Sequence, residues 1–178
     1  MLLNLLLGVA LFAGPLPQAS PRTNDDFPAM TPDQIKNGIE KRHPAAYYIL
    51  AGKLFEAGAR DEAVFWFYSG QLRYRLHLGA NPKLPPDGDP ALYGSLSEVV
   101  GRPLNEYAFG DLMQLTATID RVLAWDEQTD NGFTSKTAHA ALWKDIRAGL
   151  LKLREYVEAN AEAIRADRKQ NGLENRKP

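Results

Sequence analysis

Residues 43 to 79 constrain the fold of this 178-residue chain more than any other stretch. After Pro44, apolar residues are spaced as on one face of an α-helix, at Tyr47, Leu50, Ala51 and Leu54. Gly58 provides a left-handed stop, and a second helix follows the turn. This second helix is apolar on all sides, which is typical of a helix buried between layers. We therefore expect it to be the central core element, with Trp66 inside the core.

Small and large residues alternate along this helical pair in a recognisable pattern. The pattern consists of Ala46, Leu50, Ala51, Leu54 and Gly58, followed by Ala63, Trp66, Phe67 and Gly70. Residues 46 to 75 thereby resemble a single tetratricopeptide or Sel1-like helical hairpin. The resemblance implies that small residues at Ala51, Ala63 and Gly70 let two antiparallel helices approach closely.

Two departures from the repeat families limit what this resemblance implies. Arg75 stands where those families usually have a helix-ending proline, and the chain contains no convincing second copy. A solenoid needs about three stacked units to be stable. We therefore expect one hairpin inside a different globule, and convergent packing of two ordinary helices remains the alternative.

The first twenty residues have the features of an export segment. An apolar run is followed by Pro15 and Pro17 and then by small residues at Ala19 and Ser20. The run is shorter than the roughly 20 apolar residues that span a bilayer, and it suits a signal peptide. We expect residues 1 to 20 to be cleaved on export, although no Lys or Arg precedes the run. Retention of residues 2 to 13 as an inner-membrane anchor, or burial as a first helix, are the alternatives.

The chain has no cysteine, and its 21 Lys plus Arg nearly balance its 22 Asp plus Glu. The lack of cysteine excludes a disulfide framework, a thiol nucleophile and a cysteine zinc site, and it favours a bacterial periplasm over a disulfide-stapled secreted scaffold. The balanced charge creates no field that recruits nucleic acid. We expect no nucleic-acid partner, and membrane contact only through residues 2 to 13 if they are not cleaved.

Turn signals divide the rest of the chain into helices. A linker at residues 21 to 30 precedes a capping box at Thr31 to Gln34. Residues 71 to 78 alternate as in a strand, but no turn separates them from the preceding helix, so we predict helix. Residues 102 to 110 are predicted to be an ordered loop or a helical turn. Further helices are predicted at 32 to 41, 90 to 100, 111 to 127 and 135 to 171.

These elements predict an all-α, single-domain antiparallel globule of about five to six helices over residues 31 to 172. The last helix loses its apolar face beyond Val157 while its charge rises, so its end is expected to project into solvent. The tail at residues 173 to 178 is expected to be frayed.

No motif in the chain indicates catalysis or cofactor binding. His43 precedes a proline at a helix start, His77 lies near a helix end, and His139 falls in a first helical turn. We assign structural or solvent-exposed roles to all three. We therefore expect no catalytic residue, no metal and no cofactor.

Two groups of carboxylates are assigned structural roles and no bound ion or partner. Asp87 and Asp89 lack the further ligands that a calcium site needs, so we assign them to a turn and a helix cap. Asp126, Glu127 and Asp130 are assigned to a solvated loop, with an acidic docking edge as the alternative.

The candidate binding surface combines cations with aromatic rings, at Tyr68, Arg73, Tyr74, Arg75 and Lys83. Such a surface can hold a carboxylate, a phosphate or an acidic loop of a protein partner. In the alternative interpretation, Arg73 pairs inside the protein with Asp61 or Glu62.

Taken together, these features predict an exported, periplasmic or secreted helical protein-interaction module without catalytic chemistry. An adaptor, an inhibitor or an immunity-type protein fits this description, with a protein partner in the cell envelope. The alternatives are an envelope hydrolase that uses two carboxylates in a deep cleft, and a membrane-tethered structural protein.

Overall fold

The computed structural model describes residues 26–177, and every regular element across them is a helix. The all-α prediction is therefore confirmed, whereas the predicted signal peptide lies outside the described residues. Short 3₁₀ helices occupy Phe27–Ala29 and Ile39–Lys41, and a π-helical turn occupies Ser97–Gly101. The α-helices are α1 (Pro32–Lys36), α2 (Ala45–Glu56), α3 (Arg60–Ala80), α4 (Asp89–Leu96), α5 (Arg102–Ala108), α6 (Leu112–Gln128), α7 (Ala140–Ala159) and α8 (Ala161–Gln170). No helix in this part of the chain has the length and apolarity needed to cross a membrane.

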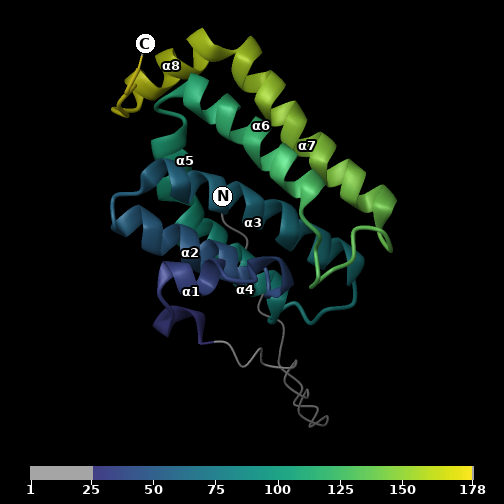
Figure 1. The fold of residues 1–178 in the computed structure, drawn as a ribbon. Helices are drawn as coiled ribbons and strands as arrows, with labels where there is room; N and C mark the ends of the chain where they lie inside the picture. Colours follow the sequence, from purple (N-terminus) through teal and green to yellow (C-terminus); the bar gives the residue numbers. More distant parts are fainter. Residues whose placement is uncertain (1–25, 178) are drawn as a thin grey trace, which may run out of the picture.

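Helix α3 occupies the centre of the structure, as its all-round apolar character predicts. It packs against α2 on one side and against α6 and α7 on the other (Figure 1). Residues 71 to 78 continue this helix, so the helical interpretation of their alternating pattern is confirmed. Ala63 and Phe67 are fully buried, but Trp66 is only partly buried, which corrects its predicted place inside the core. Its indole Nε1 donates to Glu62 at the edge of the core.

Small residues allow α2 and α3 to approach closely. A Cβ added at Gly70 would lie 2.7 Å from the Cβ of Tyr47. Ala51 and Ala63 are both completely buried. Gly58, at φ 84°, closes α2 in the left-handed conformation that the sequence predicts.

Side chains fix the starts of two other helices. Thr31 accepts a hydrogen bond from the Gln34 amide and donates its own amide to Gln34 Oε1, so the predicted capping box is present. Asp111 accepts from the Gln114 amide and caps α6. Residues 102 to 108, predicted as a loop or turn, form α5.

The C-terminal region differs from the sequence-based prediction. The chain breaks at Asn160 into α7 and α8, and residues 171–177 return to the body of the protein. The Arg176 amide donates to the Gly110 carbonyl at 2.7 Å, and the Arg176 guanidinium lies 3.5 Å from the Tyr107 ring centroid. Arg168 is 8 % exposed and donates to a tail carbonyl. The expectations of a frayed tail and of a helix end that projects into solvent are therefore wrong for the described residues. Arg168 and Arg176 bind backbone carbonyl groups, and Arg176 also packs on the Tyr107 ring.

Candidate functional site

The structure separates the five residues that were predicted to form one binding surface. Tyr68, Arg73 and Tyr74 are each at most 2 % exposed, whereas Arg75 and Lys83 are exposed. The prediction of a continuous basic and aromatic surface is therefore wrong. Tyr68, Arg73 and Tyr74 are buried because other helices cover α3 on both sides, so little of this helix faces solvent.

Arg73 lies in the core and pairs with Asp126 on α6. Its Nη2 lies 3.2 Å from Asp126 Oδ1 and donates to the Thr129 carbonyl at 3.0 Å. The guanidinium also lies 4.8 Å from the ring centroid of Trp125. Arg73 therefore has a partner inside the protein, as the alternative interpretation predicts. That partner is Asp126, however, and not Asp61 or Glu62.

Asp126 was predicted to lie in a solvated loop, and this assignment is also wrong. The Asp126 side chain is only 2 % exposed, and Oδ2 accepts from Arg147 Nη1 and Trp143 Nε1, each at 2.8 Å. Two guanidinium groups and an indole thus replace the water that would otherwise solvate this carboxylate. Glu127 and Asp130 are exposed, as the prediction had them.

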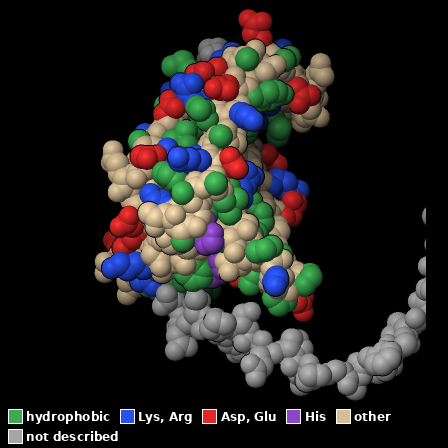
Figure 2. Space-filling view, turned by 90° about the vertical axis from the view of Figure 1, so that its right-hand side faces the viewer, with side chains coloured by type: hydrophobic (Ala, Val, Ile, Leu, Met, Phe, Trp, Pro, Cys, Tyr) green, Lys and Arg blue, Asp and Glu red, His purple; other side chains and the backbone are tan. Residues whose placement is uncertain are grey.

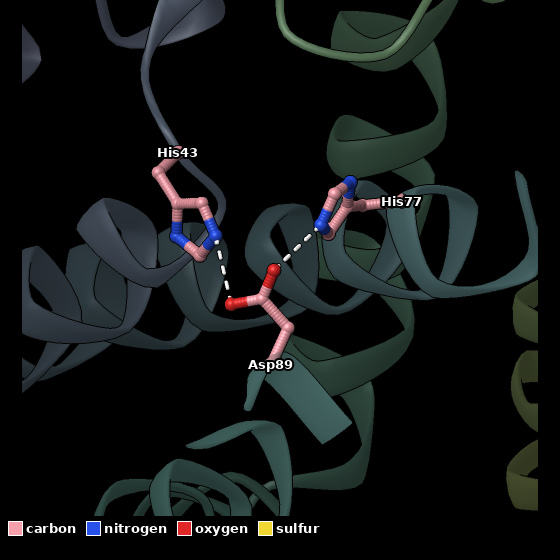
Figure 3. A group of neighbouring side chains, drawn as sticks. All are labelled: His43, His77 and Asp89. Atoms are coloured by element: carbon pink, nitrogen blue, oxygen red, sulfur yellow. Dashed lines mark hydrogen bonds and ion pairs between the residues drawn. The ribbon is translucent and has the colours of Figure 1, made fainter. Parts of the chain in front are cut away.

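His43, His77 and Asp89 meet at one point in the structure (Figure 3). They come from the residues before α2, the C-terminal part of α3 and the first residue of α4. Asp89 Oδ1 lies 3.2 Å from His43 Nε2, and Asp89 Oδ2 lies 2.8 Å from His77 Nε2. The side chains of the two histidines are 11 % and 10 % exposed, and that of Asp89 is 21 % exposed. One carboxylate therefore joins two nearly buried imidazoles.

Hydrogen bonds at the other ring nitrogens assign the tautomers. The Ala45 amide donates to His43 Nδ1 at 3.2 Å, and Asn81 Nδ2 donates to His77 Nδ1 at 3.3 Å. In a neutral imidazole only one nitrogen carries a proton, so both rings hold it on Nε2. Asp89 consequently accepts one N–H from each ring.

Aromatic side chains and a hydroxyl group enclose this cluster. The Phe133 ring contacts both imidazoles at centroid distances of 5.0 Å. Tyr74 contacts the His43 ring edge-on, and its hydroxyl lies 3.5 Å from Asp89 Oδ1. Thr134 Oγ1 lies 3.4 Å from His77 Nδ1. The cluster is thus shielded on several sides by packed side chains.

Electrostatics favour a neutral His43 and an ionised Asp89. Burial lowers the pKa of His43, and the charge and hydrogen bond of Asp89 oppose this only in part. Burial acts against ionisation of Asp89, but the hydrogen bonds and the favourable electrostatics of the His77 and His43 rings outweigh it and hold the Asp89 pKa below its ordinary value. Burial, together with Asp89, raises the pKa of Tyr74.

Sequence reasoning missed this cluster because its members are distant in the chain. His43 and His77 were assigned structural or solvent roles, and Asp89 was assigned to a helix cap. The Asp89 side chain makes no capping hydrogen bond at α4. The one available signal was that Pro44 and Pro90 place two of these residues at helix starts.

A separate groove lies between α5, α7 and α8, at the end of the molecule where α8 is labelled in Figure 1. Its volume is about 450 Å³. Phe109, Tyr156 and Ile164 form its apolar part, and Glu106 and Asp167 contribute carboxylates. Tyr156 is 57 % exposed, which is unusual for a large aromatic side chain.

Comparison with known proteins identifies one similar segment. The chain is 32 % identical over 84 residues to an uncharacterized protein of Haemophilus influenzae, and the match covers 46 % of this chain. The matched segment covers 32 % of the length of that relative. No family model and no solved structure matches the chain.

Proposed function

We propose that the chain is an exported helical protein-interaction module of the cell envelope, without catalytic chemistry, and that it docks a partner in the groove between α5, α7 and α8. The exposed ring of Tyr156 beside Phe109 and Ile164 is the observation that carries this proposal. Exposed aromatic rings that border a pocket are the usual anchors of protein interfaces. The α2–α3 hairpin, as a tetratricopeptide-like pair, then serves as the rigid support.

The carboxylates of the groove favour a particular kind of partner. Within residues 26–177, neither Glu106 nor Asp167 forms an ion pair, and Arg168 beside them donates to the Glu174 carbonyl. A partner that inserts a large apolar side chain and places a Lys or Arg next to it would satisfy both parts of the groove. Figure 2 shows acidic and basic side chains interspersed on the face that it presents, so local charges are better suited than a global field to select such a partner.

The state of the buried and partly buried carboxylates supports binding over hydrolysis. Asp126 is held by two guanidinium groups, Asp111 caps α6, and Asp89 accepts from two imidazoles. A carboxylate-based hydrolase needs two carboxylates that face each other across a substrate cleft. These three are each engaged with other groups.

Site-specific photo-crosslinking in the cell envelope tests the docking site. A photoreactive amino acid at position 156 should yield an adduct, whereas one at Leu92, an exposed residue of α4, should not. Mass spectrometry should place the crosslink on a partner peptide that carries a large apolar residue beside Lys or Arg.

Charge reversal distinguishes the groove from nonspecific capture. Glu106→Lys combined with Asp167→Lys should lower the adduct yield by about fivefold, since two exposed charge pairs of about 0.5 kcal/mol each together change the affinity by about that factor. Asp87→Lys combined with Asp145→Lys makes the same charge change away from the groove and should leave the yield unchanged. Equal adducts from positions 156 and 92, or equal yields from both double variants, would refute the docking site.

The mass of the mature N-terminus tests export separately. A chain that begins near Pro21 and is recovered from the periplasm supports release after signal cleavage. An intact Met1 in the membrane fraction supports the tethered alternative, and an intact Met1 in the cytoplasm would contradict export.

A further inference from the structure

We propose that His43, His77 and Asp89 bind one divalent transition-metal ion, with zinc as the best match. The proposal rests on the geometry of this cluster and is independent of the docking groove. One potential ligand atom from each residue lies within 4.8 Å of the other two. These atoms come from three segments that fold together, so the site is assembled only in the native structure.

The spacing of the ligand atoms is compatible with a tetrahedral ion. The two nitrogen-to-oxygen distances are 3.2 Å and 2.8 Å. Bonds of about 2.0–2.1 Å to a tetrahedral zinc ion place neighbouring ligand atoms about 3.3 Å apart. The two carboxylate-to-imidazole distances are thus close to those around a bound ion, whereas the two imidazole nitrogens, which lie within 4.8 Å of each other, have to move toward this spacing to admit it.

The types of donor atom select the class of metal. Two imidazole nitrogens and one carboxylate oxygen suit zinc and neighbouring transition metals, whereas magnesium and calcium prefer sites made of oxygen atoms. Three protein ligands leave a position for water, as in open zinc sites. The Asp89 side chain is 21 % exposed, so solvent reaches this member of the cluster.

Metal binding requires each imidazole to move its proton from Nε2 to Nδ1, while each ring keeps one proton. For His77, Asn81 Nδ2 must release Nδ1, and the Thr134 hydroxyl at 3.4 Å can then accept a hydrogen bond from the relocated Nδ1–H, because a hydroxyl group both donates and accepts. This would make Thr134 the residue that orients a ligating ring. For His43, the Ala45 amide must release Nδ1, so the ring has to turn slightly before the ion is bound.

Without a metal, the same three side chains form a hydrogen-bonded link between the residues before α2, α3 and α4. A purely structural role of this kind explains the burial of the three residues equally well, and the experiment below distinguishes it from metal binding. The two outcomes differ in a direct observable, since only the metal site places the Nε2 atoms of two histidines on an added ion.

The full chain without a histidine tag should be titrated with Zn²⁺ by calorimetry and with Co²⁺ by visible absorbance at neutral pH. We expect one ion per chain and the absorbance of tetrahedral Co²⁺. His43→Gln, His77→Gln and Asp89→Asn should each weaken the affinity by about tenfold or more. His139→Gln alters the remaining histidine, which is outside the cluster, and should bind as the wild type does.

Nuclear magnetic resonance of the wild-type histidine rings keeps the proposal testable if a variant fails to fold. Zn²⁺ should shift the Nε2 resonances of two rings and leave that of His139 unchanged. No stoichiometric uptake, unshifted Nε2 resonances at His43 and His77, or an equal loss of affinity in His139→Gln would overturn the site. Displacement of Zn²⁺ by an equal concentration of Mg²⁺ would overturn the assignment to transition metals.

Discussion

Replacing Gly70 with alanine tests the close approach of α2 and α3. The added Cβ would lie 2.7 Å from Tyr47 Cβ and 3.2 Å from two ring atoms of Tyr48. Both tyrosines are buried, and a Cβ atom cannot rotate away, so the helices themselves must separate. Overpacking costs about 1–3 kcal/mol, and the better helix propensity of alanine returns about 1 kcal/mol. Because the contact involves two Cβ atoms, we expect the unfolding free energy to fall by about 1–2 kcal/mol.

Gly149→Ala provides the matched control for this substitution. Gly149 lies in the middle of α7, and an added Cβ there meets nothing within 4 Å. The same chemical change should therefore raise the unfolding free energy by about 0.5–1 kcal/mol. Urea unfolding followed by helical circular dichroism measures both variants, with unchanged denaturant slopes as the check on two-state behaviour. If Gly70→Ala stabilises the protein as much as Gly149→Ala, the argument for close helix contact is refuted.

The buried charges and the tyrosines give the remaining predictions. Asp126→Asn should lower the unfolding free energy by about 3–5 kcal/mol in the same assay, because Arg73 and Arg147 lose a buried carboxylate. As the control, Glu127→Gln removes only an exposed partner of Arg147 and should lower the unfolding free energy by less than about 1 kcal/mol. Lys136→Met should cost about 1–2 kcal/mol, because the ammonium group donates to carbonyls at the end of α6. Burial raises the pKa of Tyr47, Tyr48 and Tyr68, as it does that of Tyr74. Above a pH of about 10 the unfolded chain therefore binds fewer protons than the folded one, and stability should fall as the pH rises. The part of the tyrosinate absorbance that comes from these buried tyrosines should appear together with the loss of helical dichroism, and their ionisation in a chain with native dichroism would contradict their burial.

The helices were predictable because their apolar spacing is strong and their ends carry local signals. The α2–α3 hairpin follows from Gly58 and from small residues that only a close helix pair requires. The capping box at Thr31 was read correctly for the same reason, since both of its hydrogen bonds join residues three positions apart. Signals of this kind lie within a few residues of the structure that they determine.

The candidate sites were not predictable, because burial of a polar residue depends on partners that the fold brings from elsewhere. Arg73 has the sequence context of a surface cation, and only the arrival of Asp126 from α6 makes its burial favourable. His43 and Asp89 each look like ordinary helix-start residues until the fold places Asp89 between His43 and His77 of α3. The break at Asn160 was missed because residues on both sides of it favour a helix.

The turn at residues 129–137 joins the two polar networks at the end of α3. Thr129 accepts from Arg73 through its carbonyl, and Thr134 reaches Nδ1 of His77. Arg73 and His77 are four residues apart on α3, so their side chains point to the same side of that helix. The buried Asp126 network therefore fixes the turn that covers the histidine cluster. A metal ion at that cluster would bind to a site whose surroundings are already held in place by the core, which lowers the cost of ordering the ligands.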